Sequence, residues 1–272
     1  MSKLTPPHGN GPLNPLLAPE AERQGALQRA GALRQVPMSS REVSDLLMLA
    51  MGAYTPLTGF MGEADWRGCC LDMKTADGLF WPIPITLSCD SDLADGITVG
   101  EEVALVDEAG TVFGILEVAE KYAIEKAFEC THVYRTTDIA HAGVEKVMRQ
   151  GAVNLAGPVT ALNEGHYAES YPVLYYRPED TRALFQAQGW STVAAFQTRN
   201  PMHRSHEYLA KIAVEICDGL LIHQVLGALK SGDIPADVRV ASIDALVANY
   251  FVPGTVIQAG YPIEMRYAGP RE

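Results

Sequence analysis

The chain has 272 residues, of which 47% are hydrophobic and 20% charged, and its 21 Lys and Arg against 33 Asp and Glu give a formal net charge of −12. This composition is typical of globular proteins and excludes a disordered or collagen-like chain. The length favours two domains, and the negative charge argues against non-specific binding to nucleic acid or to anionic membranes.

The first 35 residues are rich in Pro, Gly and Ala, and the stretch of Pro6-Pro7 and Gly9-Asn10-Gly11-Pro12 predicts an extended arm. Ser39 and Glu42 then have the spacing of a capping box, so a helix is expected to begin there and to end before Gly52. The apolar face of that helix is predicted to consist of Val43, Leu46, Leu47 and Ala50.

A β-rich region follows, and it predicts a small barrel or sandwich in the N-terminal part. The run at residues 152–162 contains Gly157-Pro158 and is typical of an edge or bent strand. Three further strands are expected at residues 79–88, 102–106 and 112–118. Turn residues at 107–110 predict that the last two of these form a hairpin.

Strands and helices alternate in the last third of the chain, which is typical of a parallel sheet covered by helices. Ligands of such sheets bind at the carboxyl ends of the strands. From residue 197 onward, 7 basic and 8 acidic residues nearly balance, whereas the preceding part carries 14 and 25, so an anionic substrate is expected to bind here. The elements are predicted at 178–188, 190–197, 201–217, 220–226, 236–250 and 255–259.

The first strand end is the segment with the strongest chemical signal. Asn200 and Pro201 suit the N-cap and first position of a helix, whose free N–H groups and dipole attract anions. Arg199 stands directly before them, and its planar guanidinium matches tetrahedral oxyanions such as sulfate or phosphate.

His203 and His206 share one face of the predicted helix, beside its apolar stripe. A helix N-terminus disfavours their charged form, so they are expected to act as neutral donors to phosphate oxygens. Two alternative roles remain for these histidines. In the first, one of them is a cap partner of the helix and the other lies at the edge of the core. In the second, they ligate zinc, although their spacing differs from the His-Glu-x-x-His motif. The stripe consists of Tyr208, Leu209, Ile212, Ala213 and Ile216.

The five cysteines are predicted to be free structural thiols. Their number is odd, and Cys69 and Cys70 are adjacent, which is poor geometry for an ordinary disulfide. Free thiols are typical of a reducing compartment. Because no apolar run approaches the length of a membrane span, a soluble cytoplasmic protein without membrane partners is expected.

Residues 197–206 read QTRNPMHRSH, and this run resembles the signature of the ATP sulfurylase (sulfate adenylyltransferase) family. Residues 52–61, 230–234 and 265–272 resemble the same family. The resemblance implies a PUA-like β domain at residues 1–168 and a Rossmann-like parallel α/β nucleotidyltransferase domain of the HxGH type at residues 169–272. It also implies a homo-oligomer.

The implied reaction is ATP plus sulfate giving adenylyl sulfate and diphosphate, by direct in-line attack of sulfate on the α-phosphate, with Mg²⁺ accompanying ATP. The same reaction can run in reverse to make ATP. By this resemblance Gln197 and Arg199 bind sulfate, and Lys230, Arg266 and Arg271 are further candidate contacts, with no residue assigned to a metal. ATP binding is assigned to Gln197, Thr198, Arg199, Asn200, His203 and His206, of which all but Gln197 are also expected to be catalytic.

Two features depart from the family pattern. Residues 230–233 read Lys-Ser-Gly-Asp where Lys-Pro-Gly-Asp is expected, and the Gly-Arg-Asp-His motif of the family's nucleotide loop does not occur. The catalytic domain is therefore expected to be truncated at its C-terminus. The sequence leaves two alternative functions: an adenylyltransferase acting on a carboxylate, and a non-catalytic PUA-type RNA-binding protein with a degenerate α/β domain.

Overall fold

The computed structural model describes residues 4–227 and 234–272. The strands are β1 (Arg34–Pro37), β2 (Gly59–Phe60), β3 (Leu87–Cys89), β4 (Glu102–Val106), β5 (Val112–Glu117), β6 (Glu120–Ala123), β7 (Val153–Ala161), β8 (Val193–Thr198), β9 (Gly219–Val225) and β10 (Val256–Tyr261). The α-helices are α1 (Glu20–Ala30), α2 (Ser40–Ala50), α3 (Glu63–Asp72), α4 (Ser91–Gly96), α5 (Lys126–Glu129), α6 (Ala142–Arg149), α7 (Tyr167–Ser170), α8 (Pro178–Ala187), α9 (Arg204–Ile216) and α10 (Ala236–Tyr250).

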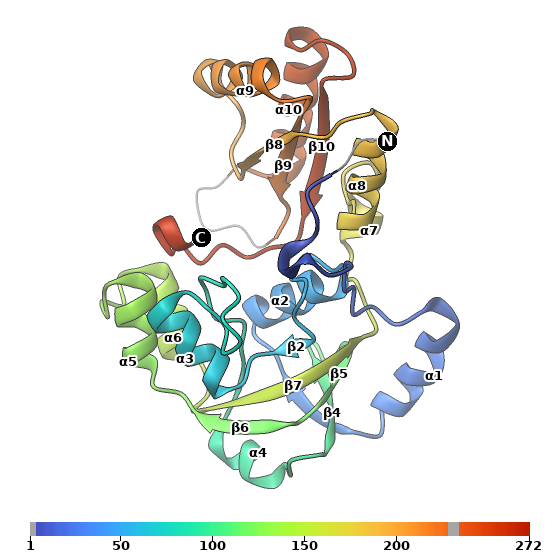
Figure 1. Cartoon of the computed structure of the whole chain (residues 1–272). Helices are drawn as coiled ribbons and strands as arrows, with labels where there is room; N and C mark the ends of the chain where they lie inside the picture. The colour runs from blue at the N-terminus through green and yellow to red at the C-terminus, as the bar shows by residue number, and fades with distance from the viewer. Residues whose placement is uncertain (1–3, 228–233) are drawn as a thin grey trace.

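These elements form two lobes (Figure 1). We call α1–α6 with β1–β7 the N-terminal lobe, and α7–α10 with β8–β10 the C-terminal lobe. Within the described residues the N-terminal lobe has a seven-stranded mixed sheet, in the order β1-β4-β5-β7-β2, with β3 and β6 also paired to β7. The predicted hairpin is confirmed, because β4 and β5 are antiparallel neighbours. Strand β7 bends at Gly157, as expected, but it lies inside the sheet and not at its edge.

One expectation for the N-terminal lobe is wrong and another is incomplete. The stretch predicted as an extended arm contains a short 3₁₀ turn, η1 (His8–Asn10), and α1 follows it, where Ala, Gln and Arg favour a helix and Glu20 and Glu22 lie near its N-terminus. The strand expected at residues 79–88 is reduced to β3. Pro82 and Pro84 interrupt that run and have no N–H to donate to a neighbouring strand.

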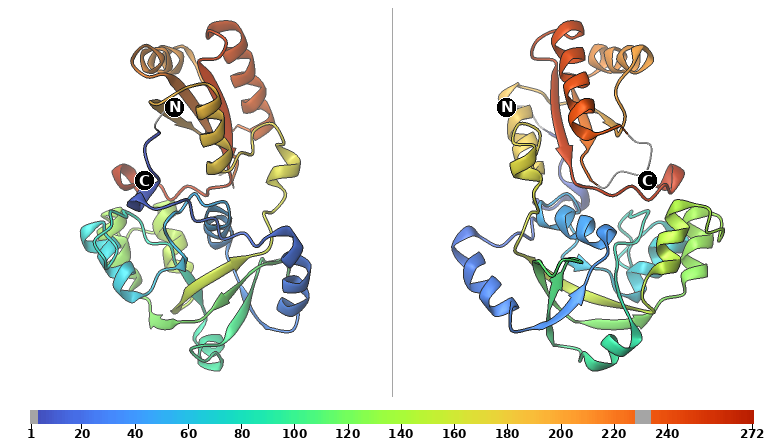
Figure 2. Two further views of the ribbon diagram at one scale, coloured as in Figure 1. Left: turned by 45° about the vertical axis from the view of Figure 1, so that its right-hand side comes forward. Right: turned by 180° about the vertical axis from the view of Figure 1, so that it is seen from behind.

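Helix α2 begins where the sequence predicts. The Ser39 side chain accepts a hydrogen bond from the Glu42 N–H, and the Glu42 carboxylate accepts one from the Ser39 N–H, which completes the capping box. Gly52 follows the helix at φ +81°, a backbone conformation that glycine adopts readily. Most of α2 is buried, so this helix lies at the centre of the molecule, between the two lobes (Figures 1 and 2).

The C-terminal lobe confirms the predicted alternation. In the described part of the chain, β8, β9 and β10 form a parallel sheet in the order β10-β9-β8. Helices α9 and α10 pack on one face around Ile222 and Ile243, and α8 packs on the other through Phe185. Figure 2 shows these helices on opposite sides of the sheet.

Of the apolar stripe expected on α9, Ala213 packs against the sheet, whereas the four larger side chains are exposed. Tyr208 and Ile216 are 67% and 77% exposed, whereas Ala210 is fully buried. The helix therefore packs through its small residues, with Ala210 and Ala213 against the sheet, and carries its larger apolar side chains on the outside.

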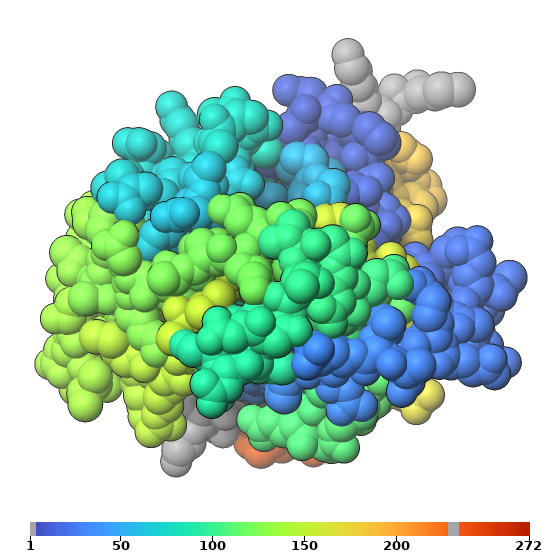
Figure 3. All heavy atoms as spheres, turned by 90° about the horizontal axis from the view of Figure 1, so that it is seen from below, coloured from blue at the N-terminus to red at the C-terminus, as the bar shows by residue number. Residues whose placement is uncertain are grey.

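The two lobes are in direct contact. Met48 of α2 and Met51, the C-cap residue of that helix, pack against Val225 and Tyr261 at the carboxyl ends of β9 and β10. At the N-terminal end of the chain, Leu4 joins the apolar cluster under α8. Seen from below, the N-terminal lobe covers nearly the whole view, and the C-terminal lobe shows only at its margins (Figure 3).

Candidate active site

The carboxyl ends of the parallel strands bring together two of the three predicted segments. Thr198 ends β8 and Tyr261 ends β10, and both strands are paired with β9. The segment after β10 then runs back toward the end of β8, where the Arg199 Nη1 donates to the Tyr267 hydroxyl at 2.9 Å. Lys230, from the second segment, lies outside the described residues.

Arg199 is held by an aromatic ring. Its guanidinium carbon lies 5.0 Å from the centre of the Tyr267 ring, in a cation–π arrangement. Tyr267 has a positive φ of 59°, which turns the chain at this residue. Arg199 is only partly buried, so an oriented guanidinium is presented at the strand end.

The segment after β8 is a tight turn and not yet a helix. The Thr198 hydroxyl donates to the Asn200 carbonyl at 2.8 Å and accepts from the Asn200 N–H at 3.0 Å. Gln197 is exposed, with its Nε2 3.5 Å from the Met265 sulfur. The predicted N-cap at Asn200 is wrong, because the helix begins at Arg204 with His203 as its N-cap.

His203 and His206 form the start of α9 together. The His203 Nδ1 accepts from the Ser205 N–H at 3.3 Å, the His206 Nδ1 accepts from the His203 N–H at 3.3 Å, and the ring centroids are 3.9 Å apart. A nitrogen that accepts a backbone N–H carries no proton, so these bonds favour neutral rings with Nε2 as the donor. Burial and then the neighbouring His203 lower the pKa of His206, causes other than the helix dipole.

His203 is therefore the N-cap residue of α9, as the first alternative expects. This role is compatible with anion binding, because the Nε2 of the ring is still a donor. An open hollow of about 700 Å³ lies beside this helix start and is lined by His203, Tyr208 and Lys211 among others. No group of three or more His, Cys, Asp or Glu that could hold a metal ion occurs within residues 4–227 and 234–272.

Arg239 is a residue of this site that sequence reasoning missed. Its side chain is fully buried, and its guanidinium donates to the Arg199 carbonyl at 2.8 Å and to the Val225 carbonyl. Arg239, which lies on α10, thus links the turn after β8 to the end of β9. An arginine near the start of a helix carries no sequence signal that separates this role from an exposed one.

Two predicted anion contacts have other partners. Arg266 is 5% exposed and forms an ion pair with Asp45 of α2. Arg271 donates to the carbonyls of Cys69 and Cys70 at 3.0 and 3.1 Å, at the end of α3. Both guanidinium groups thus contact the N-terminal lobe, and an anion contact by Arg266 or Arg271 stays a prediction.

His223 is a second residue that sequence reasoning missed. It is the register partner of Gln197 on β9, and its ring stacks on Tyr261 with centroids 3.8 Å apart. Burial lowers the pKa of His223 to about 4. The His223 ring is therefore neutral at pH 7, and it packs against Tyr261 at the end of the neighbouring strand β10.

We expect His223 to make the stability of the protein pH-dependent. Between pH 6.5 and 4 the unfolded chain binds a proton at this residue and the folded chain does not, so the free energy of unfolding falls as the pH falls. At pH 5 the loss is about 1–2 kcal/mol. Urea unfolding of the parent and of His223→Phe, which keeps the stacking, measures it at pH 7 and pH 5. Equal losses in both proteins would contradict the prediction.

A parallel α/β sheet with a helix N-terminus, paired histidines and an oriented arginine at its strand ends is suited to bind the phosphates of a nucleotide. Comparison with known proteins agrees. Residues 5–164 match the family model of a PUA-like domain, and residues 172–272 match that of ATP-sulfurylase. The chain belongs to the sulfate adenylyltransferase family of nucleotidyltransferases, as the resemblance in its sequence predicted.

Its relatives include the sulfate adenylyltransferases of Chlorobaculum tepidum, 59% identical, and Thiobacillus denitrificans, 57% identical. The alignments cover 99% and 100% of this chain and 67% of each relative. Among solved structures, the hexameric APS kinase from Thiobacillus denitrificans is similar with a TM-score of 0.75 and 28% identity, over 98% of this chain and 49% of that one. The chain thus spans about two thirds of the length of these curated relatives. No helix in the described ranges is long and apolar enough to cross a membrane.

Proposed function

We propose that the turn after β8 and the start of α9 bind ATP and sulfate, and that the reaction at this site is the formation of adenylyl sulfate and diphosphate by in-line attack of sulfate on the α-phosphate. The single observation that carries the proposal is that Gln197, Arg199, His203 and His206 all lie on the segment that runs from the end of β8 to the start of α9, in a member of this family.

The proposed roles follow from the donors that each side chain offers. Arg199 and Gln197 contact sulfate, because a guanidinium fork and an amide N–H both suit its oxygens. Thr198 and Asn200 shape the turn and face ATP. His203 and His206 donate from Nε2 to the phosphate oxygens on which charge develops. Lys230 remains a candidate contact.

The reaction needs no side-chain nucleophile, because the sulfate oxygen itself attacks phosphorus. Catalysis can then come from holding the two anions in line and from donors aimed at the developing charge. Neutral histidines are suited to this task, since they add hydrogen-bond donors without the cost of burying a further charge.

In this proposal Mg²⁺ arrives with the substrate. Magnesium usually keeps several water ligands and binds through phosphate oxygens, so MgATP can bring the ion with it. The residues proposed here then need to bind only the outer oxygens of the triphosphate and the sulfate.

We also propose a domain boundary between residues 168 and 169, a homo-oligomeric assembly and a cytoplasmic location. The proposed boundary falls within the short helix α7 (Tyr167–Ser170), which connects β7 to α8. The oligomer is supported by the hexameric state named for the solved relative. Free cysteines, four of them buried, suit a reducing compartment. Nucleic acid is not among the proposed partners, given the net charge of −12.

The test is release of diphosphate that depends on sulfate, with molybdate as a second substrate. Molybdate mimics sulfate and forms an unstable adenylate, so the proposed enzyme should hydrolyse ATP continuously in its presence. A carboxylate-specific adenylyltransferase would respond to neither oxyanion, and an RNA-binding protein would show no turnover. Either result in folded protein would reject the proposal.

We expect the cysteines to take no part in the reaction. Burial raises the pKa of Cys69 to about 12 and of Cys89 and Cys130 to about 11, and it also raises that of Cys70, so their reactive thiolates are suppressed. Iodoacetamide should therefore label mainly Cys217 in the folded protein, and turnover should stay within about three-fold. Peptide mass analysis with an activity assay checks both. Inactivation that follows Cys217 labelling would contradict the prediction.

A further inference from the structure

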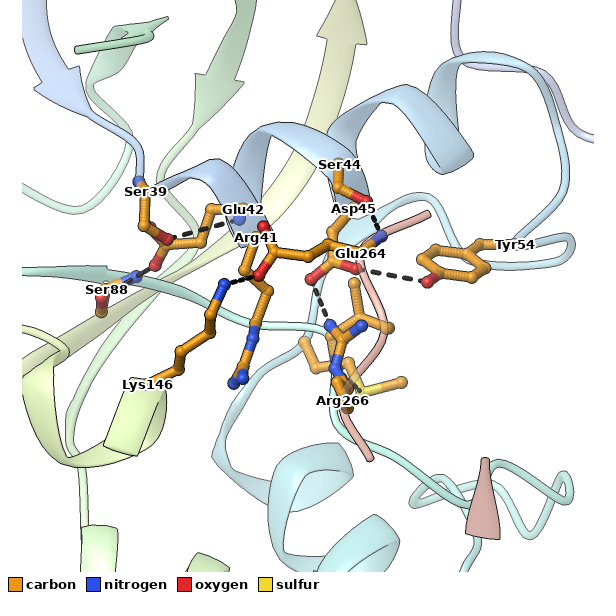
Figure 4. A network of polar contacts seen from close by, with 12 residues as sticks. Ser39, Arg41, Glu42, Ser44, Asp45, Tyr54, Ser88, Lys146, Glu264 and Arg266 are labelled. Atoms are coloured by element: carbon orange, nitrogen blue, oxygen red, sulfur yellow. Dashed lines mark hydrogen bonds and ion pairs between the residues drawn. The ribbon is translucent and has the colours of Figure 1, made fainter. Parts of the chain in front are cut away.

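A buried network of charges joins α2 of the N-terminal lobe to the segment after β10 (Figure 4). Asp45 of α2 is 1% exposed, pairs with Arg266 and accepts from the Tyr54 hydroxyl at 3.2 Å. Glu264, two residues before Arg266, is 3% exposed and pairs with Lys146 of α6. The N-terminal lobe therefore supplies a partner for each buried charge of this segment.

The backbone of the same segment is also held by α2. The Ser44 hydroxyl donates to the Pro262 carbonyl at 2.9 Å and accepts from the Glu264 N–H at 2.7 Å. From α6, Gly143 lies so close to the Arg266 carbonyl that an added Cβ would come within 2.3 Å of it. The path of the chain into Tyr267 is thus determined by contacts with helices that lie more than a hundred residues earlier in the sequence.

Tyr267 connects the buried charge network to Arg199 at the end of β8. It follows Arg266 directly, its carbonyl lies 3.1 Å from the His141 Nε2, and its hydroxyl accepts from Arg199. A shift of Arg266 would move Tyr267 and remove the support on which the Arg199 guanidinium rests.

We propose that Asp45 is a positioning residue for the strand-end site: by pairing with Arg266 it holds Tyr267 in place and so orients Arg199 toward its oxyanion. This rests on the function proposed above. The N-terminal lobe then contributes to sulfate binding without touching the substrate, and Asp45 acts only through Arg266, Tyr267 and Arg199.

The test is a double-mutant cycle. Asp45→Asn in the parent should lower kcat/KM for sulfate by about 10–100-fold, since small displacements of a binding group have effects of this size. In an Arg199→Lys background the same change should cost less than about two-fold, because the group that it positions is already gone. Tyr54→Phe is the matched control, because it removes the other hydrogen bond to Asp45 and leaves the pair with Arg266 intact.

A merely structural role predicts a different pattern. Loss of stability alone would reduce the amount of active protein, and the two substitutions would then multiply in the cycle, which would overturn the proposal. Should Asp45→Asn fail to fold, Arg266→Lys keeps a cation beside Asp45 and is expected to give the same non-additive pattern.

Tyr267→Phe tests the last link without disturbing the buried pair. It should lower kcat/KM for sulfate by at least about five-fold, again with little effect in the Arg199→Lys background. A change below two-fold would overturn the proposal. Absence of sulfate-dependent turnover in the parent would instead reject the proposed function, so the two failures are distinguishable.

Discussion

Replacement of Arg199 by lysine is expected to lower sulfate-dependent release of diphosphate by about 10²–10³-fold. Lysine keeps the positive charge but loses the planar fork that can donate two parallel hydrogen bonds to an oxyanion. It also loses the guanidinium face that lies over the Tyr267 ring. The lost interaction strengthens as charge develops in the transition state, and a loss of about 3–4 kcal/mol corresponds to this fall in rate.

The measurement compares kcat and KM for sulfate in the parent and in Arg199→Lys at temperatures of equal fractional folding. Arg204→Lys is the matched control, because Arg204 lies five residues further along the chain, its side chain is 83% exposed, and its ion pair with Glu207 at 3.3 Å can also be made by lysine. The control should stay within two-fold of the parent. If Arg199→Lys stays within three-fold, Arg199 does not bind sulfate.

The second large effect is expected on stability, at Glu42. Its carboxylate is 2% exposed and accepts from the N–H and hydroxyl groups of both Ser39 and Ser88, at 2.7–2.8 Å. It thereby joins the start of α2 to β3. Glu42→Ala leaves these donors without their acceptor, two of them main-chain N–H groups, and should lower the free energy of unfolding by about 3–5 kcal/mol.

Denaturant unfolding followed by circular dichroism measures this loss. Glu145→Ala is the control, because Glu145 makes an exposed pair with Arg149 on α6, and its removal should cost less than about 0.5 kcal/mol. Glu42→Gln retains one acceptor oxygen and should fall between the two. A loss below 1 kcal/mol in Glu42→Ala would show that water replaces the carboxylate at little cost.

Features that depend on neighbouring residues in the chain could be predicted from the sequence. The capping box of Ser39 and Glu42 identifies the start of α2, since both partners lie within one helical turn. The range predicted for α10, residues 236–250, is the one observed, because its apolar periodicity and the preceding Pro235 are local signals. The alternation of strands and helices likewise predicted the parallel sheet and the edge at which the candidate site lies.

Local signals also misled where a later residue competed for the same role. Asn200 and Pro201 are good residues for a helix start, yet α9 begins at Arg204. The His203 and His206 rings cap that start reciprocally, and the Thr198 hydroxyl already holds the Asn200 N–H in a turn. Histidine is not a common N-cap residue in sequence patterns, so Asn200 and Pro201 were the stronger signal for the start of the helix.

The roles of the arginines became apparent only in the folded chain. Arg199, Arg239, Arg266 and Arg271 are equivalent in a sequence pattern, and their partners separate them: the Tyr267 hydroxyl for Arg199, main-chain carbonyls for Arg239 and Arg271, and the Asp45 carboxylate for Arg266. The pair of Asp45 and Arg266 joins residues 221 positions apart. Hydrophobic periodicity and capping act over one or two helical turns, whereas a buried charge must find its partner wherever the packed chain brings one, so its role is settled only when the lobes come together.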